Sequence, residues 1–268
     1  MAAALPRRSG AQPAPLQFGV MPNVSTRILL AQYQHFRAFL ESESGRAVEV
    51  VTAPGLQPFH QRTLAGAYGV VVTAANLARV AQLDAGMRPV AIYEPRIPGL
   101  LVARRDRVPA DLGALRGRQV AMTNPQSLVA LRFVRWLAVN AGLQVGRDVM
   151  ALHARNEDSL VQLLTGPDTP LAVMSRGELN AIRPDLRETL VVWREFEQVP
   201  GFVVLLHPDL PAAEAARLEA ALARFPRSEA GAAFFAATGF RDIRPIAPAE
   251  MEEIDPVVAE TRALLGQP

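Results

Sequence analysis

The sequence predicts an α/β fold with two lobes. Short runs of apolar and β-branched residues alternate with longer segments in which apolar residues recur every three or four positions, which is the pattern of strands followed by helices. Two long apolar strands, around 99–104 and 201–207, bracket the middle of the chain. We therefore expect a second lobe inserted into the first, with two crossing strands that act as hinges between them.

These two strands set the expected domain boundaries. The first lobe should hold 16–100 and 206–268, and the second lobe should hold 101–205. Ligands of such folds bind between the lobes, against the carboxyl ends of the strands. Residues 1–15 precede the first strand and are expected to be the remainder of an export signal or a disordered tail.

The first lobe is expected to begin with a strand at 16–21 and a helix at 26–43. Ser25 or Thr26 is a suitable N-cap for that helix, and Gly45 is expected to end it. The elements expected next are a strand at 47–53, a helix from 57 that ends near Gly66, a strand at 69–75, a helix at 75–85 and a strand at 90–95.

The same alternation continues through the second lobe and back into the first. The elements expected there are a strand at 99–106, a short helix and a strand within 111–125, a helix at 127–142, a strand at 149–154, a helix at 157–165, a strand at 170–175, a helix at 176–182 and strands at 189–196 and 201–208. Helices at 212–225 and 229–239 and a helical tail at 250–265 complete the expected fold.

The composition favours a folded protein that does not bind nucleic acid. Half of the 268 residues are apolar, and the formal net charge is only +2. All 28 basic residues are arginine and they are scattered, whereas a nucleic-acid-binding face concentrates its charge. The absence of cysteine excludes thiol catalysis, thiolate metal sites and disulfides. No stretch is long and apolar enough to be expected to cross a membrane.

The N-terminal segment has features of an export signal. "MAAALPRRSGAQPAPLQ" is rich in alanine and proline, and "SGA" before Gln12 resembles a small-residue cleavage site. A basic first region and a full apolar region are missing. We expect the mature protein to begin near Gln12 and to be periplasmic or otherwise exported, with an ordinary disordered tail as the alternative.

Polar residues follow several of the predicted strands, where strand-to-helix loops should face the cleft. An amide or hydroxyl in such a loop either contacts a ligand or caps the next helix, and both interpretations stay open. The candidate ligand-binding residues are Asn23, Ser25, Thr26, Thr73, Asn76, Asn124, Ser127, Asn156 and Ser175.

The pattern of reactive residues disfavours an enzyme. The four histidines have no metal-ligand spacing, and neither a nucleophile-elbow motif nor a phosphate-binding loop of an ATPase occurs. Glu157 and Asp158 are the only carboxylates beside one of the strand-end loops. We expect no catalytic residue, no metal and no cofactor, and we keep an enzyme on the same fold as the less favoured alternative.

Three segments resemble periplasmic solute-binding proteins of the phosphonate, phosphite and phosphate type. "FGVMP" is similar to the opening of these proteins, "LGALRGRQVAMTNPQS" to their central segment, and "GFVVLLHPDLP" with the helices after it to their C-terminal part. The similarity extends over about 16–265. It implies a two-lobed type II periplasmic-binding-protein fold that delivers a small solute to an ABC importer and performs no chemistry.

The resemblance is weakest where the family holds its ligand. The family's Asp-Pro-x-Ser-x-Ser-Gly loop keeps its frame in Asn124 and Ser127, but Leu-Val-Ala at 128–130 replaces the hydroxyl-rich continuation. Four further family positions also differ: Leu56 replaces a tyrosine, Gly69 an aspartate, Asn156 a histidine and Pro170 an acidic residue. Each lost hydrogen bond is worth roughly 0.5–1.5 kcal/mol, and more where a charged oxygen accepts it, so losing two or three would weaken phosphonate binding by about a hundredfold or more.

The sequence therefore predicts a solute-binding protein with a pocket that has diverged from phosphonate binders. The solute should be small and anionic, with an apolar body against Leu128 and Val129. Its expected partner is an ABC permease in the membrane, and the expected state is a monomer. The alternative is a ligand-binding module that reports to a sensor kinase or another signalling protein.

Overall fold

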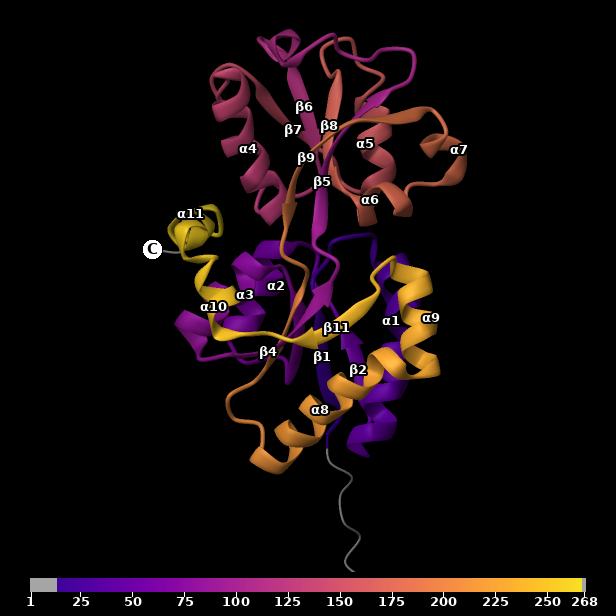
Figure 1. Cartoon of the computed structure of the whole chain (residues 1–268), viewed down its shortest axis with the longest axis vertical. Coiled ribbons are helices and arrows are strands. Elements are labelled where there is room, and N and C mark those ends of the chain that lie inside the picture. Colours follow the sequence, from indigo (N-terminus) through magenta and orange to yellow (C-terminus); the bar gives the residue numbers. More distant parts are fainter. Residues whose placement is uncertain (1–13, 267–268) are drawn as a thin grey trace, which may run out of the picture.

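Two β-sheets divide the chain into two lobes that are stacked along its long axis (Figure 1). The structure is a computed structural model, and it describes residues 14–266. The expected export signal at 1–15 falls almost wholly outside the described residues. Within them, the α/β class and the two-lobed arrangement predicted from the sequence are confirmed.

The sheet of the first lobe has six strands in the order β11-β4-β10-β3-β1-β2. Strands β1, β2 and β3 run parallel, whereas β10 and β11 pair antiparallel with β4. The strands are β1 (Leu16–Val20), β2 (Val48–Val51), β3 (Val70–Thr73), β4 (Arg88–Glu94), β10 (Val203–Leu206) and β11 (Asp242–Pro245). β10 follows the second lobe in the sequence, so the sheet of the first lobe is completed by residues that come after the second lobe.

The sheet of the second lobe has five strands in the order β7-β6-β8-β5-β9. Strands β6, β7 and β8 run parallel, and the long strands β5 and β9 pair antiparallel on one side of them. The strands are β5 (Ile97–Arg104), β6 (Gln119–Met122), β7 (Met150–His153), β8 (Leu171–Ser175) and β9 (Leu190–Val199).

Helices cover both faces of the first sheet. An aromatic cluster around Phe18, Phe36 and Phe234 fills the face under α1, α8 and α9, while Phe59 and Leu77 belong to the core on the other face, under α2 and α3. These elements are α1 (Thr26–Ser44), α2 (Leu56–Leu64), α3 (Ala75–Ala85), α8 (Ala212–Arg224), η2 (Phe225–Arg227) and α9 (Glu229–Thr238).

The second sheet is covered in the same way, with alternate residues of a strand facing opposite cores. Leu101 of β5 shares a core with Phe133 of α4, whereas Leu100 shares a core with Leu160 of α5 and Leu179 of α6. The elements are η1 (Leu112–Leu115), α4 (Leu128–Ala141), α5 (Glu157–Leu163), α6 (Arg176–Ala181) and the short α7 (Pro184–Arg187), which the sequence did not predict.

The chain crosses between the sheets at two short segments rather than along the predicted strands. β5 pairs with β8 and β9 along its length, and β10 pairs with β3 and β4. The crossings are therefore Pro95–Arg96 and Pro200–Phe202, and the expected boundaries near 100 and 205 are displaced by several residues. Glu94, Pro95 and Arg96 interrupt the apolar pattern at the first crossing, and Pro200 and Gly201 interrupt it at the second.

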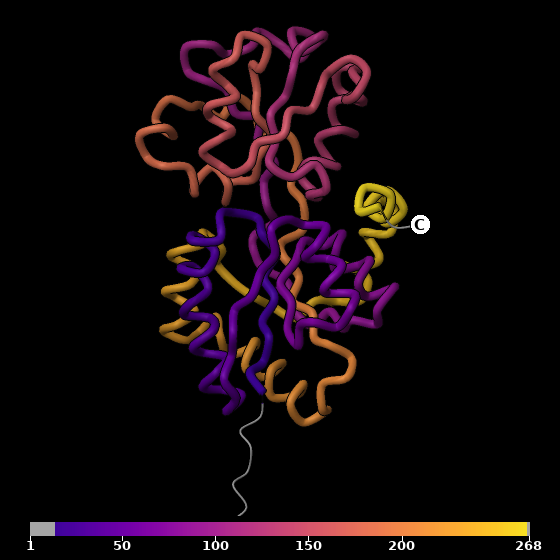
Figure 2. Tube along the Cα trace, turned by 180° about the vertical axis from the view of Figure 1, so that it is seen from behind, coloured from indigo at the N-terminus to yellow at the C-terminus, as the bar shows by residue number. Residues whose placement is uncertain are grey.

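The C-terminal segment, residues 246–266, runs along the side of the molecule. It contains α10 (Pro248–Glu252), η3 (Asp255–Val257) and α11 (Val258–Leu264), in place of the single tail helix expected at 250–265. Figure 2, seen from behind, also shows α11 beside the junction between the lobes. Asp84 and Asp255 pair with arginines to fix this segment to α3, and Glu260 pairs with Arg135 of α4 at 2.7 Å.

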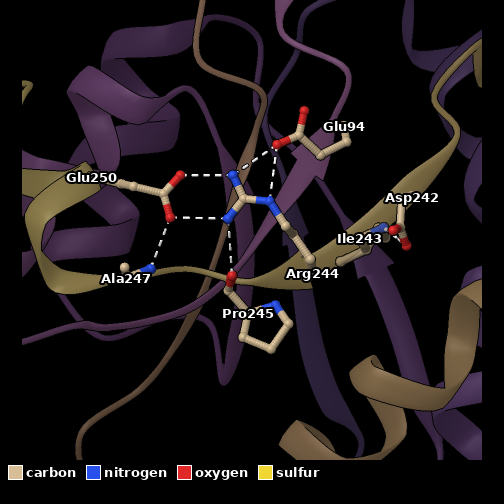
Figure 3. Close-up of polar contacts among 7 residues, drawn as sticks. All are labelled: Glu94, Asp242, Ile243, Arg244, Pro245, Ala247 and Glu250. Atoms are coloured by element: carbon tan, nitrogen blue, oxygen red, sulfur yellow. Dashed lines mark hydrogen bonds and ion pairs between the residues drawn. The ribbon is translucent and has the colours of Figure 1, made fainter.

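Arg244 joins this segment to the end of β4. Its guanidinium lies between Glu94 and Glu250 (Figure 3), at 2.8 Å and 2.7 Å from their carboxylate oxygens. The Arg244 guanidinium lowers the pKa of Glu250 to about 2. Since Glu94 directly precedes the first crossing, this cluster ties the C-terminal segment to the hinge region.

Candidate ligand-binding cleft

The loops that follow β1, β6, β7 and β8 meet between the two lobes. Parallel strands place their carboxyl ends at one edge of a sheet, so the strand-to-helix loops of each lobe gather at one end. The two sheets present those ends to each other. Of the nine candidate residues, seven line cavities at this junction: Asn23, Ser25, Thr26, Asn124, Ser127, Asn156 and Ser175.

The larger cavity, of about 260 Å³, lies on the side of α1, α6 and α9. Both lobes and the two crossings contribute to it. Its apolar wall includes Ile97, Phe202 and Phe240. This volume is close to the lower end of the range for small-molecule sites, ~300–1,000 Å³.

A smaller cavity, of about 40 Å³, lies at the start of α4. It shares Asn23, Ile97, Ser175 and Phe202 with the larger cavity, so the two adjoin. Leu128 and Val129, which are only 2% and 8% exposed, line it together with Ser127. Leu128 and Val129 therefore border this cavity with apolar surface.

A third cavity, of about 150 Å³, lies where the start of α1 in the first lobe meets the start of α5 in the second, and it shares Asn23 and Val24 with the larger cavity. It is lined by Ser25, Thr26 and Asn156, and the backbone N–H of Ser25 donates to the carboxylate of Glu157 at 3.3 Å. Glu157 is 6% exposed, so this bond joins the lobes through a buried carboxylate. The structure is thus a form in which the lobes touch.

Three candidate residues cap helices of the second lobe. The side chains of Ser127, Asn156 and Ser175 accept backbone N–H groups from Ala130, Ser159 and Glu178 at 3.2, 2.9 and 3.2 Å. Capping satisfies one of the N–H groups that the first turn of a helix leaves without an intrahelical partner. Ser25 occupies the N-cap position of α1 but makes no side-chain capping bond.

Thr73 and Asn76 do not line these three cavities. Both are buried, at 1% and 0% exposed. The Asn76 amide donates to the hydroxyl of Thr261 in α11 at 3.2 Å and to the carbonyl of Gln126 at 3.4 Å. Asn76 therefore connects α3, the C-terminal segment and the loop before α4.

Glu178 brings a carboxylate to the small cavity, which the sequence reasoning missed. It accepts from the hydroxyl of Thr123, and from the N–H and hydroxyl of Ser175 at 2.7 and 2.8 Å. Burial raises the pKa of Glu178, and these hydrogen bonds oppose part of the rise. The Ser-x-x-Glu spacing at 175–178 is a capping-box pattern and could have identified it.

Three arginines of the larger cavity were also missed. Arg96 comes from the first crossing, Arg176 from the start of α6 and Arg241 from the loop after α9. Their separation in the sequence gives no sign that they share a cavity. Among the described residues that line it there is no aspartate or glutamate.

The described part of the chain holds no cluster of three or more histidine, cysteine, aspartate or glutamate residues able to bind a metal. Within the same residues, no helix combines the length and the apolar character needed to cross a membrane. The cavities between the lobes offer amides, hydroxyls, arginines, the carboxylates of Glu157 and Glu178, and apolar walls.

Comparison with known proteins agrees with this architecture. The sequence model of the family described as "ABC transporter, phosphonate, periplasmic substrate-binding protein" matches residues 18–251. A search of curated proteins finds no match.

Solved structures share the fold at low sequence identity. A binding protein component of an ABC phosphonate transporter from Pseudomonas aeruginosa has a TM-score of 0.77 and 14% identity, over 95% of this chain and 89% of that one. PhnD1 from Prochlorococcus marinus, in complex with methylphosphonate, has a TM-score of 0.77 and 12% identity, over 94% and 98%. The periplasmic aliphatic sulphonate binding protein SsuA from Escherichia coli has a TM-score of 0.65 and 16% identity, over 94% of each.

The family match covers most of the chain, including both lobes and the cleft between them. The chain belongs to the family of periplasmic substrate-binding proteins of phosphonate ABC transporters.

Proposed function

We propose that this protein is exported, binds one small anionic solute between its lobes and delivers it to the permease of an ABC importer. The observation that carries the proposal is the larger cavity, whose lining comes from the first lobe, the second lobe and both crossings. A solute in that cavity touches both lobes at once, so its binding favours the form in which they are closed.

We further propose that the pocket has diverged from simple phosphonates. The start of α4 presents Leu128 and Val129 to the small cavity, and the hydroxyl of Ser127 is engaged in capping. Burial of about 100 Å² of apolar ligand surface there would contribute roughly 2.5 kcal/mol, which is comparable to the hydrogen bonds lost. The favoured solute is an organic anion with an apolar body.

Native mass spectrometry of freshly purified protein tests solute binding directly. We expect a co-purified small molecule in stoichiometric amount. Small-angle scattering with that molecule added and removed should show a smaller radius of gyration in the bound protein. A protein that binds no small molecule, or one whose radius is the same with and without bound solute, would contradict the proposal.

A thermal-shift screen tests the divergence of the pocket. Phosphate, phosphite, methylphosphonate and a series of alkyl carboxylates are compared at equal concentration. We expect a clear shift from longer carboxylates and weak shifts from the small phosphorus anions. Micromolar binding of phosphate or methylphosphonate would contradict the divergence of the pocket.

A further inference from the structure

The arginines of the larger cavity come from separate parts of the fold. Arg176 lies on the second lobe, Arg241 lies on the first, and Arg96 lies on the crossing between them, where it also donates to the carbonyl of Gln198 at 3.3 Å. None of the three forms an ion pair with any described residue. All three are exposed and line the same cavity where the lobes meet, so they give that cavity a positive charge.

The balance of charge differs between the ends of the cleft. Arg96 also borders a separate cavity that Glu94 and Glu250 line, so these carboxylates offset part of its positive charge. Arg176 and Arg241 have no acidic neighbour in the lining of the larger cavity. At the other end, the small cavity at α4 holds the carboxylate of Glu178 and no arginine among its lining residues.

We propose that the anionic group of the solute is held by Arg176 and Arg241, with Arg96 beside them, and not at the N-terminus of α4. The inference rests on the proposed function and assigns the orientation of the solute within the cleft. Guanidinium groups bind carboxylate, phosphonate and sulfonate oxygens through strong charge-assisted hydrogen bonds. An anion at the start of α4 would instead face Glu178.

The apolar walls define the rest of the ligand. Ile97 and Phe202 border both cavities, and Leu128 and Val129 lie at the far end. A ligand with its anionic head at the arginines would extend its apolar body along Ile97 and Phe202 toward α4. A hydroxyl or amino group at its far end would meet Asn124 or the Glu178 carboxylate as acceptors.

This arrangement makes closure depend on an anion. Arg176 of one lobe and Arg241 of the other line the same cavity in this form, in which the lobes touch. An anion held by both residues contacts both lobes, which it can do only in the closed form. A ligand shifts a conformational equilibrium by its difference in affinity for the two forms, so the anionic head is the part that drives closure.

The test compares matched ligands and matched variants by calorimetry. The probes are alkyl carboxylates, sulfonates and phosphonates of graded chain length, together with the neutral amide of each carboxylate. The variants are Arg176→Gln, Arg241→Gln and the control Arg217→Gln, an exposed arginine on α8 that is not part of the cleft lining. Equal urea midpoints across the variants establish that they fold.

We expect at least one anion of the series to bind the wild-type protein more tightly than its neutral amide. Arg176→Gln and Arg241→Gln should each weaken anion binding about tenfold or more. They should leave the weak binding of the amide unchanged, and Arg217→Gln should have no effect. Wild-type affinity for anions in both cleft variants, or no binding of any anion of the series at millimolar concentration, would overturn the inference.

The outcome is separable from that of the proposed function. If a co-purified solute is present and compacts the protein, but both arginine variants bind it as tightly as the wild type does, the solute-binding role stands and the assigned orientation is wrong. If neither a solute nor compaction is found, the proposed function itself fails.

Discussion

Gly201 of the second crossing lies against the backbone of Tyr93 in β4, and this contact leads to a quantitative prediction. A Cβ at Gly201 would lie 1.9 Å from the carbonyl oxygen of Tyr93 and 2.8 Å from its carbonyl carbon. The same pair of segments is joined by a hydrogen bond from the N–H of Tyr93 to the carbonyl of Phe202, at 2.9 Å. A side chain at position 201 therefore has no space while that bond is kept.

Gly201→Ala should separate the second crossing from β4 by roughly 1 Å or more, because both contacting atoms belong to the backbone of β4. Forcing a methyl group into a packed site costs about 1–3 kcal/mol. Loss of the Tyr93–Phe202 hydrogen bond adds about 1 kcal/mol. The expected fall in the free energy of unfolding is therefore about 2–4 kcal/mol.

Urea denaturation measures this change. The matched control is Gly55→Ala, because Gly55 has an extended backbone and the nearest atom to its added Cβ is Pro58 Cδ at 3.9 Å. Gly55 is the N-cap residue of α2, where glycine is preferred to alanine, so the control should lose at most about 1 kcal/mol. If the stability of Gly201→Ala falls within about 0.5 kcal/mol of the control, the close approach of Gly201 to β4 is refuted, because this difference lies below the smallest overpacking cost expected.

Three further predictions follow from the same structure. Burial lowers the pKa of His60 to about 4 from an ordinary 6.5. As the pH falls, the unfolded chain is protonated at this histidine before the folded chain is. The free energy of unfolding should therefore fall by about 3 kcal/mol as the pH drops from 6.5 to 4. In urea titrations His60→Gln should flatten that slope, and a slope equal to wild type would contradict the assignment. Ser127→Ala should lower stability by about 1 kcal/mol through loss of the α4 cap, whereas full stability with weakened solute binding would make Ser127 a ligand contact instead. Arg244→Gln should raise the pKa of Glu250 from about 2 toward its ordinary value in an NMR titration, and an unshifted pKa would mean that Arg244 is not the cause.

Local pattern was enough to find most of the fold. The helix expected at 75–85 has those bounds as α3, and the strand expected at 16–21 and helix at 26–43 differ from β1 and α1 by one residue at one end. Helical spacing of apolar residues and capping residues act over a few positions, so the sequence carries them directly. The same short-range logic placed Ser127, Asn156 and Ser175 at helix starts beside the cleft.

Tertiary structure alone decided which strands pair and which side chains meet. β11 is a short polar segment without alternation, and it is a strand only because β4 offers it an edge. Arg96, Arg176 and Arg241 share one cavity because the chain leaves the first lobe, builds the second and returns. Contacts between residues so far apart in sequence depend on how the whole backbone folds, and this cannot be predicted from the local periodicity of apolar residues.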